Sequence, residues 1–91
     1  MNRKDEIMMA IVDYMKSIEL TDVKHSVTKV NIVLKVAQKL NIPESQEYSV
    51  IEGFDELYKI DMIRSSYRTY DEKGVVSTTI STNDEKFYLK P

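Results

Sequence analysis

Residues 43–63 read PESQEYSVIEGFDELYKIDMI, and this stretch decides how the chain is expected to fold. Apolar side chains recur in it at helical spacing, at Val50, Phe54, Leu57 and Tyr58. Proline suits the first position of a helix, so Pro43 predicts where this helix begins. The side chains expected on its outward face are those of Gln46, Ser49, Glu52, Gly53, Glu56 and Lys59.

Acidic residues are concentrated in this predicted helix. Residues 44–61 carry six acids and one base, a net charge of −5, in a chain whose net charge is −2. A helix that enters a DNA groove neutralises phosphates with Lys and Arg, whereas this one presents the opposite charge. We therefore expect its outward face either to stay in solvent or to dock a protein with a basic surface.

Length and composition limit the class of protein. Ninety-one residues supply one hydrophobic core, so we expect a single domain over residues 1–91. No apolar run is long enough to cross a membrane, and zero cysteines exclude disulfides and fit a cytoplasmic location. Lysine outnumbers arginine ten to three, a usage typical of an AT-rich genome such as that of a low-GC bacterium or its phage.

Two helices are expected before residue 43. The first spans about Arg3 to Leu20, and its inward side chains are Ile7, Ile11, Tyr14 and Ile18, with Met8 and Met15 beside them. The second spans residues 29–40, ends before Pro43, and has as inward side chains Val30, Val33, Leu34, Ala37 and Leu40. Between the two helices, Val23 and Val27 predict a short strand.

After residue 61 the chain is rich in β-branched and aromatic residues. Strands at 62–70 and 75–82 predict a β-hairpin, and the turn at 71–74 ends in Gly74, which accepts a positive φ. A short final strand is expected at residues 86–91. The predicted fold class is therefore α+β, with three helices followed by a β-hairpin and a short strand between the first two helices.

This order of elements resembles the winged-helix (winged helix-turn-helix) superfamily, in which the hairpin is called the wing. QKLNIPES at residues 38–45 is similar to the turn between the second and third helices, and FDELYKIDMIRSSY at 54–67 to the exit of the third helix. EKFYLKP at 85–91 is similar to the closing strand. The resemblance covers nearly the whole chain without indicating a subfamily, and it implies a binding module.

Our first hypothesis is a non-enzymatic regulatory or accessory protein that acts by protein–protein contact. Its candidate contacts lie on the acidic helix: Glu47, Tyr48, Glu52 and Glu56. Tyr48 is either an exposed aromatic anchor or a side chain that packs against Ile42. One version of this hypothesis is a phage or mobile-element protein that blocks a basic, nucleic-acid-handling host protein.

The alternative is a DNA-binding transcriptional regulator. The resemblance implies that Gln46 and Ser49 would face the groove, while the backbone would be held by Lys24, Lys29, Arg64, Arg68 and Lys73. On a strand over residues 62–70, Arg64 and Arg68 would share one face with Ser66 and Tyr70. Such an Arg–Tyr face can hold phosphates or bases, but Arg on an edge strand also discourages aggregation, and both interpretations stay open.

No catalytic, cofactor-binding or metal site is predicted. The chain has one histidine, His25, no cysteine and no Gly-rich phosphate loop, and its adjacent acidic pairs point apart. Met8, Met9 and Met15 on the first helix predict a homodimer through that helix, or else they fill the core of the domain itself.

Overall fold

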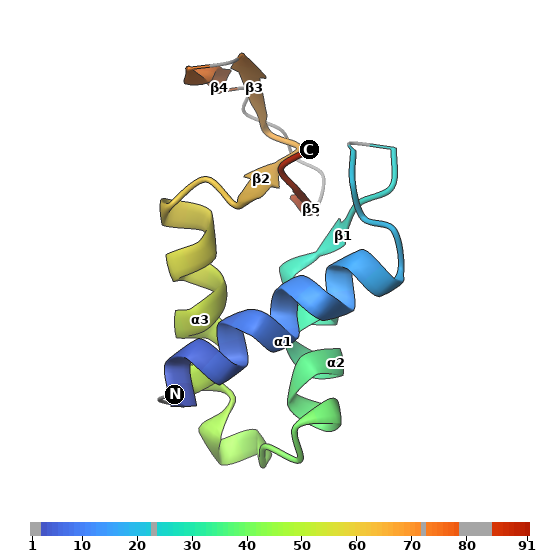
Figure 1. Cartoon of the computed structure of the whole chain (residues 1–91), viewed down its shortest axis with the longest axis vertical. Coiled ribbons are helices and arrows are strands. Elements are labelled where there is room, and N and C mark those ends of the chain that lie inside the picture. The colour runs from blue at the N-terminus through green and yellow to red at the C-terminus, as the bar shows by residue number, and fades with distance from the viewer. Residues whose placement is uncertain (1–2, 23, 72, 79–84) are drawn as a thin grey trace.

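The computed structural model describes residues 3–22, 24–71, 73–78 and 85–91. Its helices and strands are α1 (Arg3–Ser17), β1 (Val27–Thr28), α2 (Lys29–Lys39), the short 3₁₀ helix η1 (Glu44–Gln46), α3 (Tyr48–Lys59), β2 (Ile63–Ser65), β3 (Arg68–Asp71), β4 (Gly74–Thr78) and β5 (Lys86–Leu89). Helix α1 crosses over α2 and α3, and the strands lie at the end away from the α2–α3 turn (Figure 1). None of the helices in the described ranges is long and apolar enough to cross a membrane.

The strands form two sheets. In the first, β5 lies in the centre and pairs antiparallel with β1 and with β2, so that Phe87 is opposite both Val27 and Ser65. The second is the β3–β4 hairpin, which extends beyond the rest of the molecule (Figure 1). Its turn ends in Gly74 at φ +122°, which confirms the predicted need for glycine. The short strand predicted at Val27 is also confirmed, while Val23 and residues 79–82 lie outside the described residues.

The hydrophobic core lies where α1 packs on α2, α3 and β5. The rings of Phe54 of α3 and Phe87 of β5 pack perpendicular to each other, with 4.9 Å between the ring centroids. Tyr58 packs on the same ring at 5.8 Å. The core residues are Ile7, Ile11, Met15, Leu20, Ile32, Val33, Val36, Ala37, Ile42, Val50, Phe54, Leu57, Ile63, Phe87 and Leu89.

The helices α1, α2 and α3 end in the same hydrogen-bonded motif. A residue with a positive φ follows each helix, and these residues are Glu19 (57°), Asn41 (55°) and Asp61 (64°). The next backbone N–H then donates to the carbonyl five residues earlier, from Leu20 to Met15, from Ile42 to Ala37 and from Met62 to Leu57. This Schellman motif satisfies helix carbonyls and reverses the chain, so that Leu20 and Ile42 turn back into the core.

Two predicted helix boundaries were wrong. Helix α1 ends at Ser17 and not at Leu20, so Ile18 is exposed and Met15 takes its place in the core. The third helix was expected to begin at Pro43, but Pro43 is extended and precedes η1, and α3 begins at Tyr48. The predicted apolar face is confirmed at Val50, Phe54 and Leu57, and Tyr58 is half-buried.

The inward face predicted for α2 was partly wrong. Val33 and Ala37 are buried as expected, but Val30 and Leu34 are exposed, and Ile32 and Val36 fill the core instead. The apolar side chains of α2 spread over a wider arc of the helix than the four buried residues occupy, so its own periodicity does not determine which part of that arc is buried. The positions of α1 and α3 decide which side is covered.

Gly53 was predicted on the outward face of the third helix, and this was also wrong. It is buried where α3 passes under α1, and a Cβ atom built on it would lie 2.9 Å from Cγ2 of Ile7. Glycine is therefore required by the close approach of the two helices. The strand predicted over residues 62–70 is broken at Ser66 and Tyr67, which separates β2 from β3.

Over the described residues, the α+β architecture has three α-helices, one short 3₁₀ helix and a set of strands that includes a β-hairpin. The order of the elements and the β1–β5–β2 sheet are compatible with the winged-helix resemblance.

Candidate functional site

Half of the acids between residues 44 and 61 are paired with cations of the same molecule. Asp55 accepts a 2.6 Å hydrogen bond from Nζ of Lys29, which links α3 to the start of α2. The carboxylate of Glu56 lies 3.8 Å from Nζ of Lys4 on α1. Glu56, one of the predicted protein contacts, therefore faces α1, and the negative charge of Asp55 is offset by Lys29.

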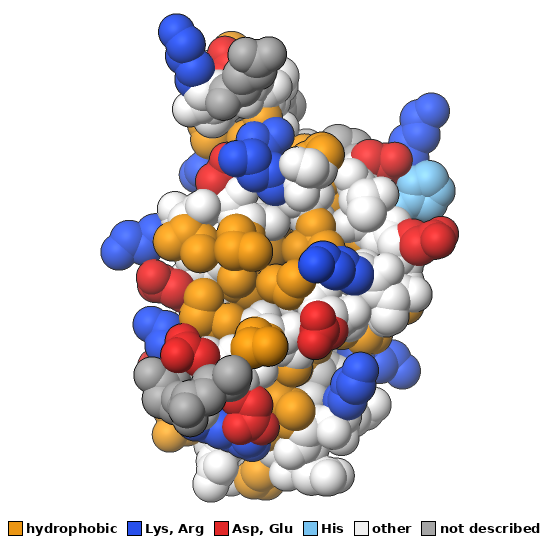
Figure 2. Space-filling model, in the orientation of Figure 1, with side chains coloured by type: hydrophobic (Ala, Val, Ile, Leu, Met, Phe, Trp, Pro, Cys, Tyr) orange, Lys and Arg blue, Asp and Glu red, His pale blue; other side chains and the backbone are white. Residues whose placement is uncertain are grey.

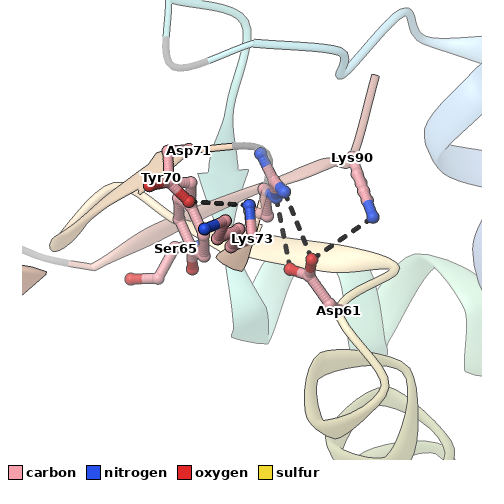
Figure 3. A network of polar contacts seen from close by, with 7 residues as sticks. Asp61, Ser65, Tyr70, Asp71, Lys73 and Lys90 are labelled. Carbon is pink, nitrogen blue, oxygen red and sulfur yellow. Dashed lines mark hydrogen bonds and ion pairs between the residues drawn. The ribbon is translucent and has the colours of Figure 1, made fainter. Parts of the chain in front are cut away.

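Asp61 lies between two cations at the exit of α3. Arg64 donates from Nε and Nη2 to its carboxylate, both at 3.2 Å, and Nζ of Lys90 lies 3.5 Å away (Figure 3). The hydrogen bond from Arg64 is the main cause that lowers the pKa of Asp61 below its usual value. The Arg64 side chain is 11% exposed and stacks 4.5 Å from the centroid of the Tyr70 ring, so it joins α3 to the hairpin.

A buried serine explains why the predicted strand breaks. The backbone N–H of Ser65 donates to the Tyr70 hydroxyl at 2.8 Å, and the backbone N–H of Tyr67 donates to Ser65 Oγ at 3.0 Å. The Ser65 hydroxyl also hydrogen-bonds the Glu85 carboxylate. These bonds hold a tight turn between β2 and β3, so the predicted common face of Arg64, Ser66, Arg68 and Tyr70 on one continuous strand was wrong.

Arg68 lies over the Tyr58 ring, with its guanidinium carbon 5.1 Å from the ring centroid. It lines a hollow of 660 Å³ between the start of α2, α3 and the hairpin. Lys29 lines the same hollow, as do the carboxylates of Asp55 and Glu85. Because both signs of charge line it, this hollow is not a continuous basic surface of the kind that holds a phosphate backbone.

The structure places the predicted DNA contacts on separate elements. Lys24 is exposed before β1, and Lys73 is exposed at the tip of the hairpin. Lys29 is in an ion pair and also lies 5.3 Å from the Phe54 ring centroid. Gln46 is exposed on η1, and Ser49 is half-buried on α3. Arg68 lines one hollow together with Lys29 and another together with Lys73, but each hollow also has an aspartate in its lining. Two of the five basic candidates, Lys29 and Arg64, are in ion pairs.

The first half of α3 and the neighbouring part of α2 carry exposed apolar side chains. Tyr48 is 61% exposed, which favours the first of the two alternatives predicted for it, and Ile51 one turn later is 39% exposed. Leu34 of α2 is 43% exposed and lines a 350 Å³ hollow together with Glu44 and Glu47. Residues three and four apart are neighbours on a helix surface, so Tyr48 and Ile51 adjoin Glu47 and Glu52. We call this set the corner surface: Leu34, Glu44, Glu47, Tyr48, Ile51 and Glu52.

The carboxylates of the corner surface differ from the other acids of this stretch. Within the described part of the chain, no cation lies within ion-pair distance of Glu44, Glu47 or Glu52. The predicted contacts Glu47, Tyr48 and Glu52 come together here. The sequence interpretation missed Ile51, although its spacing from Tyr48 indicates a shared face, and it placed Leu34 in the core.

His25 lies apart from this surface. Its ring Nδ1 is 2.9 Å from Oδ1 of Asp22, and its backbone N–H donates to the same oxygen at 2.9 Å. The backbone hydrogen bond is the main cause that lowers the pKa of Asp22. Across the described residues, no group of three or more His, Asp or Glu side chains is placed to hold a metal ion.

In comparisons with known proteins, no family model, no curated protein and no solved structure matches the chain.

Proposed function

We propose that this chain is a winged-helix protein that acts by binding another protein through its corner surface, and not by catalysis. The observation that carries the proposal is the coincidence of exposed Tyr48 and Ile51 with carboxylates that have no cation within reach in the described part of the chain. Tyrosine is one of the residue types enriched in protein-contact hot spots. The resemblance at residues 38–45, 54–67 and 85–91 supports the winged-helix assignment.

The chemistry of the surface indicates the kind of partner. Full burial of a large apolar side chain contributes about 1.5–3 kcal/mol, whereas an exposed ion pair contributes roughly 0.2–1 kcal/mol. Affinity should therefore come from Tyr48, Ile51 and Leu34, and the carboxylates should orient the partner and speed its approach. We expect a partner segment with apolar side chains flanked by Lys or Arg. A basic, nucleic-acid-handling host protein and a cytoplasmic location stay predictions.

The proposal is tested by an NMR titration of the ¹⁵N-labelled protein with a designed amphipathic peptide of Leu and Lys. We expect saturable shifts at the amides of Leu34, Glu47, Tyr48 and Ile51, because these residues would line the contact. A peptide of the same pattern with Glu in place of Lys is the matched control, and it should not bind. Tyr48→Ala and Glu52→Lys should each weaken binding of the Lys peptide without changing the rest of the spectrum.

Absence of saturable binding, or shifts confined to another face, would contradict the proposal. A random-sequence DNA duplex in the same titration tests the alternative. Shifts at Lys24, Arg68 and Lys73 that weaken with salt would favour a DNA-binding regulator. The homodimer predicted through the first helix concerns a different surface, the outward side of α1.

A further inference from the structure

The outward side of α1 carries a stripe of side chains whose charges are complementary to those of the same stripe on a second, antiparallel α1 helix. Its four side chains follow at offsets of four, three and four: Asp5, Met9, Val12 and Lys16. At 3.6 residues per turn these positions lie within about 60° of one another around the helix axis. Met9 is 53% exposed, Val12 is half-buried against the core, and both charged ends of the stripe are exposed. The stripe thus has one acid, two apolar side chains and one base.

An apolar hollow of 440 Å³ borders this stripe. Met8 and Val12 of α1 line it from one side, and Leu57 of α3 and Met62, which follows α3, line it from the other. Figure 2 shows hydrophobic side chains gathered between the middle of α1 and the end of α3. Met62 is itself an exposed large hydrophobic residue. Burying this area together with the stripe would remove apolar surface from water.

We infer that two copies of this chain associate through this stripe, with their α1 helices antiparallel about a two-fold axis between Met9 and Val12. Met9 of each copy then faces Val12 of the other, and Asp5 of each copy faces Lys16 of the other. The interface has an apolar centre and an ion pair at each end. The same patch is used by both copies, as a two-fold interface requires. Methionine adapts its shape to such a contact.

The charges select this direction. A parallel arrangement would bring Asp5 to Asp5 and Lys16 to Lys16, and like charges in contact repel. The antiparallel arrangement converts both contacts into attraction. The order of the four residues therefore indicates that the stripe binds the α1 helix of a second copy of the chain, in the antiparallel direction.

The test is sedimentation equilibrium of the whole chain from micromolar to millimolar concentration. The wild-type protein should show a monomer–dimer equilibrium. Asp5→Lys and Lys16→Glu should each weaken the association by about tenfold or more, because each replaces two attractive contacts by two repulsive ones. The double variant Asp5→Lys/Lys16→Glu should restore it, because the same two pairs form with their signs exchanged.

Lys35→Glu on α2 is the matched control, since it makes the same charge reversal at an exposed position off the stripe. It should leave the association unchanged. Met9→Lys should abolish the dimer, and far-UV circular dichroism checks that each variant is folded. A protein that stays monomeric at every concentration would overturn the inference. So would a dimer that is unaffected by both single reversals, or one that the double variant does not restore.

Discussion

Replacing Gly53 by alanine tests the close contact of α1 and α3 directly. The added methyl group would lie 2.9 Å from Cγ2 of Ile7 and 3.5 Å from Cδ1 of Ile11. Cγ2 is bonded to the Cβ of a β-branched residue, whose χ1 is nearly fixed in a helix, so it cannot turn away. Relief therefore requires a shift of one helix against the other.

The expected magnitude is the difference of two opposing effects. Overpacking a core by one methyl group costs about 1–3 kcal/mol, and removing glycine from a helix interior gains about 1 kcal/mol. Because Ile7 is rigid, we expect Gly53→Ala to lower the free energy of unfolding by about 1–2 kcal/mol. Urea unfolding followed by circular dichroism should show the midpoint falling by about 1 M, with an unchanged slope.

A second substitution identifies the cause. Ile7→Ala removes Cγ2, so in that background Gly53→Ala should stabilise the protein by about 1 kcal/mol through helix propensity alone. Ile7→Val keeps Cγ2 and removes only Cδ1, so it serves as the matched control and should leave the penalty in place. If Gly53→Ala stabilises the wild-type protein as much as it stabilises the Ile7→Ala variant, the inferred contact between the helices is wrong.

Three further predictions concern the exit of α3 and the hairpin. Asp61→Asn should cost about 1 kcal/mol at neutral pH, because the partly exposed carboxylate loses Arg64 and Lys90. The pKa of Asp61 in the folded protein is lowered from 3.8, mainly by the hydrogen bond from Arg64. Its contribution to the free energy of unfolding is therefore present above about pH 4, and it is lost as the pH falls through the folded-state pKa. Urea unfolding should therefore show the stabilities of wild type and variant converging below pH 4, and a constant difference would contradict this reasoning. Ser65→Ala should cost about 1–3 kcal/mol in thermal unfolding, because the buried Tyr67–Ser65–Glu85 hydrogen bonds are lost; a change within error would mean that they do not hold the turn. Gly74→Ala should cost about 1–3 kcal/mol through backbone strain, since its φ is +122° and, among the described residues other than its chain neighbours, no atom lies within 4 Å of the added Cβ; unchanged stability would show that the turn can adopt another conformation.

The sequence by itself determined the order of the three α-helices and the position of the strand-rich segment after them. Helical spacing identified the buried Val50, Phe54 and Leu57, and glycine identified the positive φ at Gly74. These signals are local: each depends on neighbours within a few residues, and each can be read from the printed chain. The acidic stretch and exposed Tyr48 were found in the same way.

The candidate surface was only partly predictable. Glu47, Tyr48 and Glu52 were identified from charge and residue type, but Leu34 was assigned to the core and Ile51 was overlooked. Leu34 is exposed because the other side of α2 packs against α1 and α3, which no property of α2 itself determines. The sequence also could not show which acids form ion pairs, because paired residues such as Lys29 and Asp55 are 26 residues apart in the chain.

Only the tertiary structure decided whether side chains that suit either the core or the surface are buried, paired or exposed. The helical spacing predicts Gly53 on the exposed face of α3, yet α1 crosses α3 at this residue and buries it. As an arginine, Arg64 could contact a phosphate, yet it is hydrogen-bonded to Asp61 and stacked on the Tyr70 ring within the same molecule. Periodicity indicates which residues share a face of a helix or strand. Burial and ion pairing depend instead on the elements that pack against that face, and those elements lie far away along the chain.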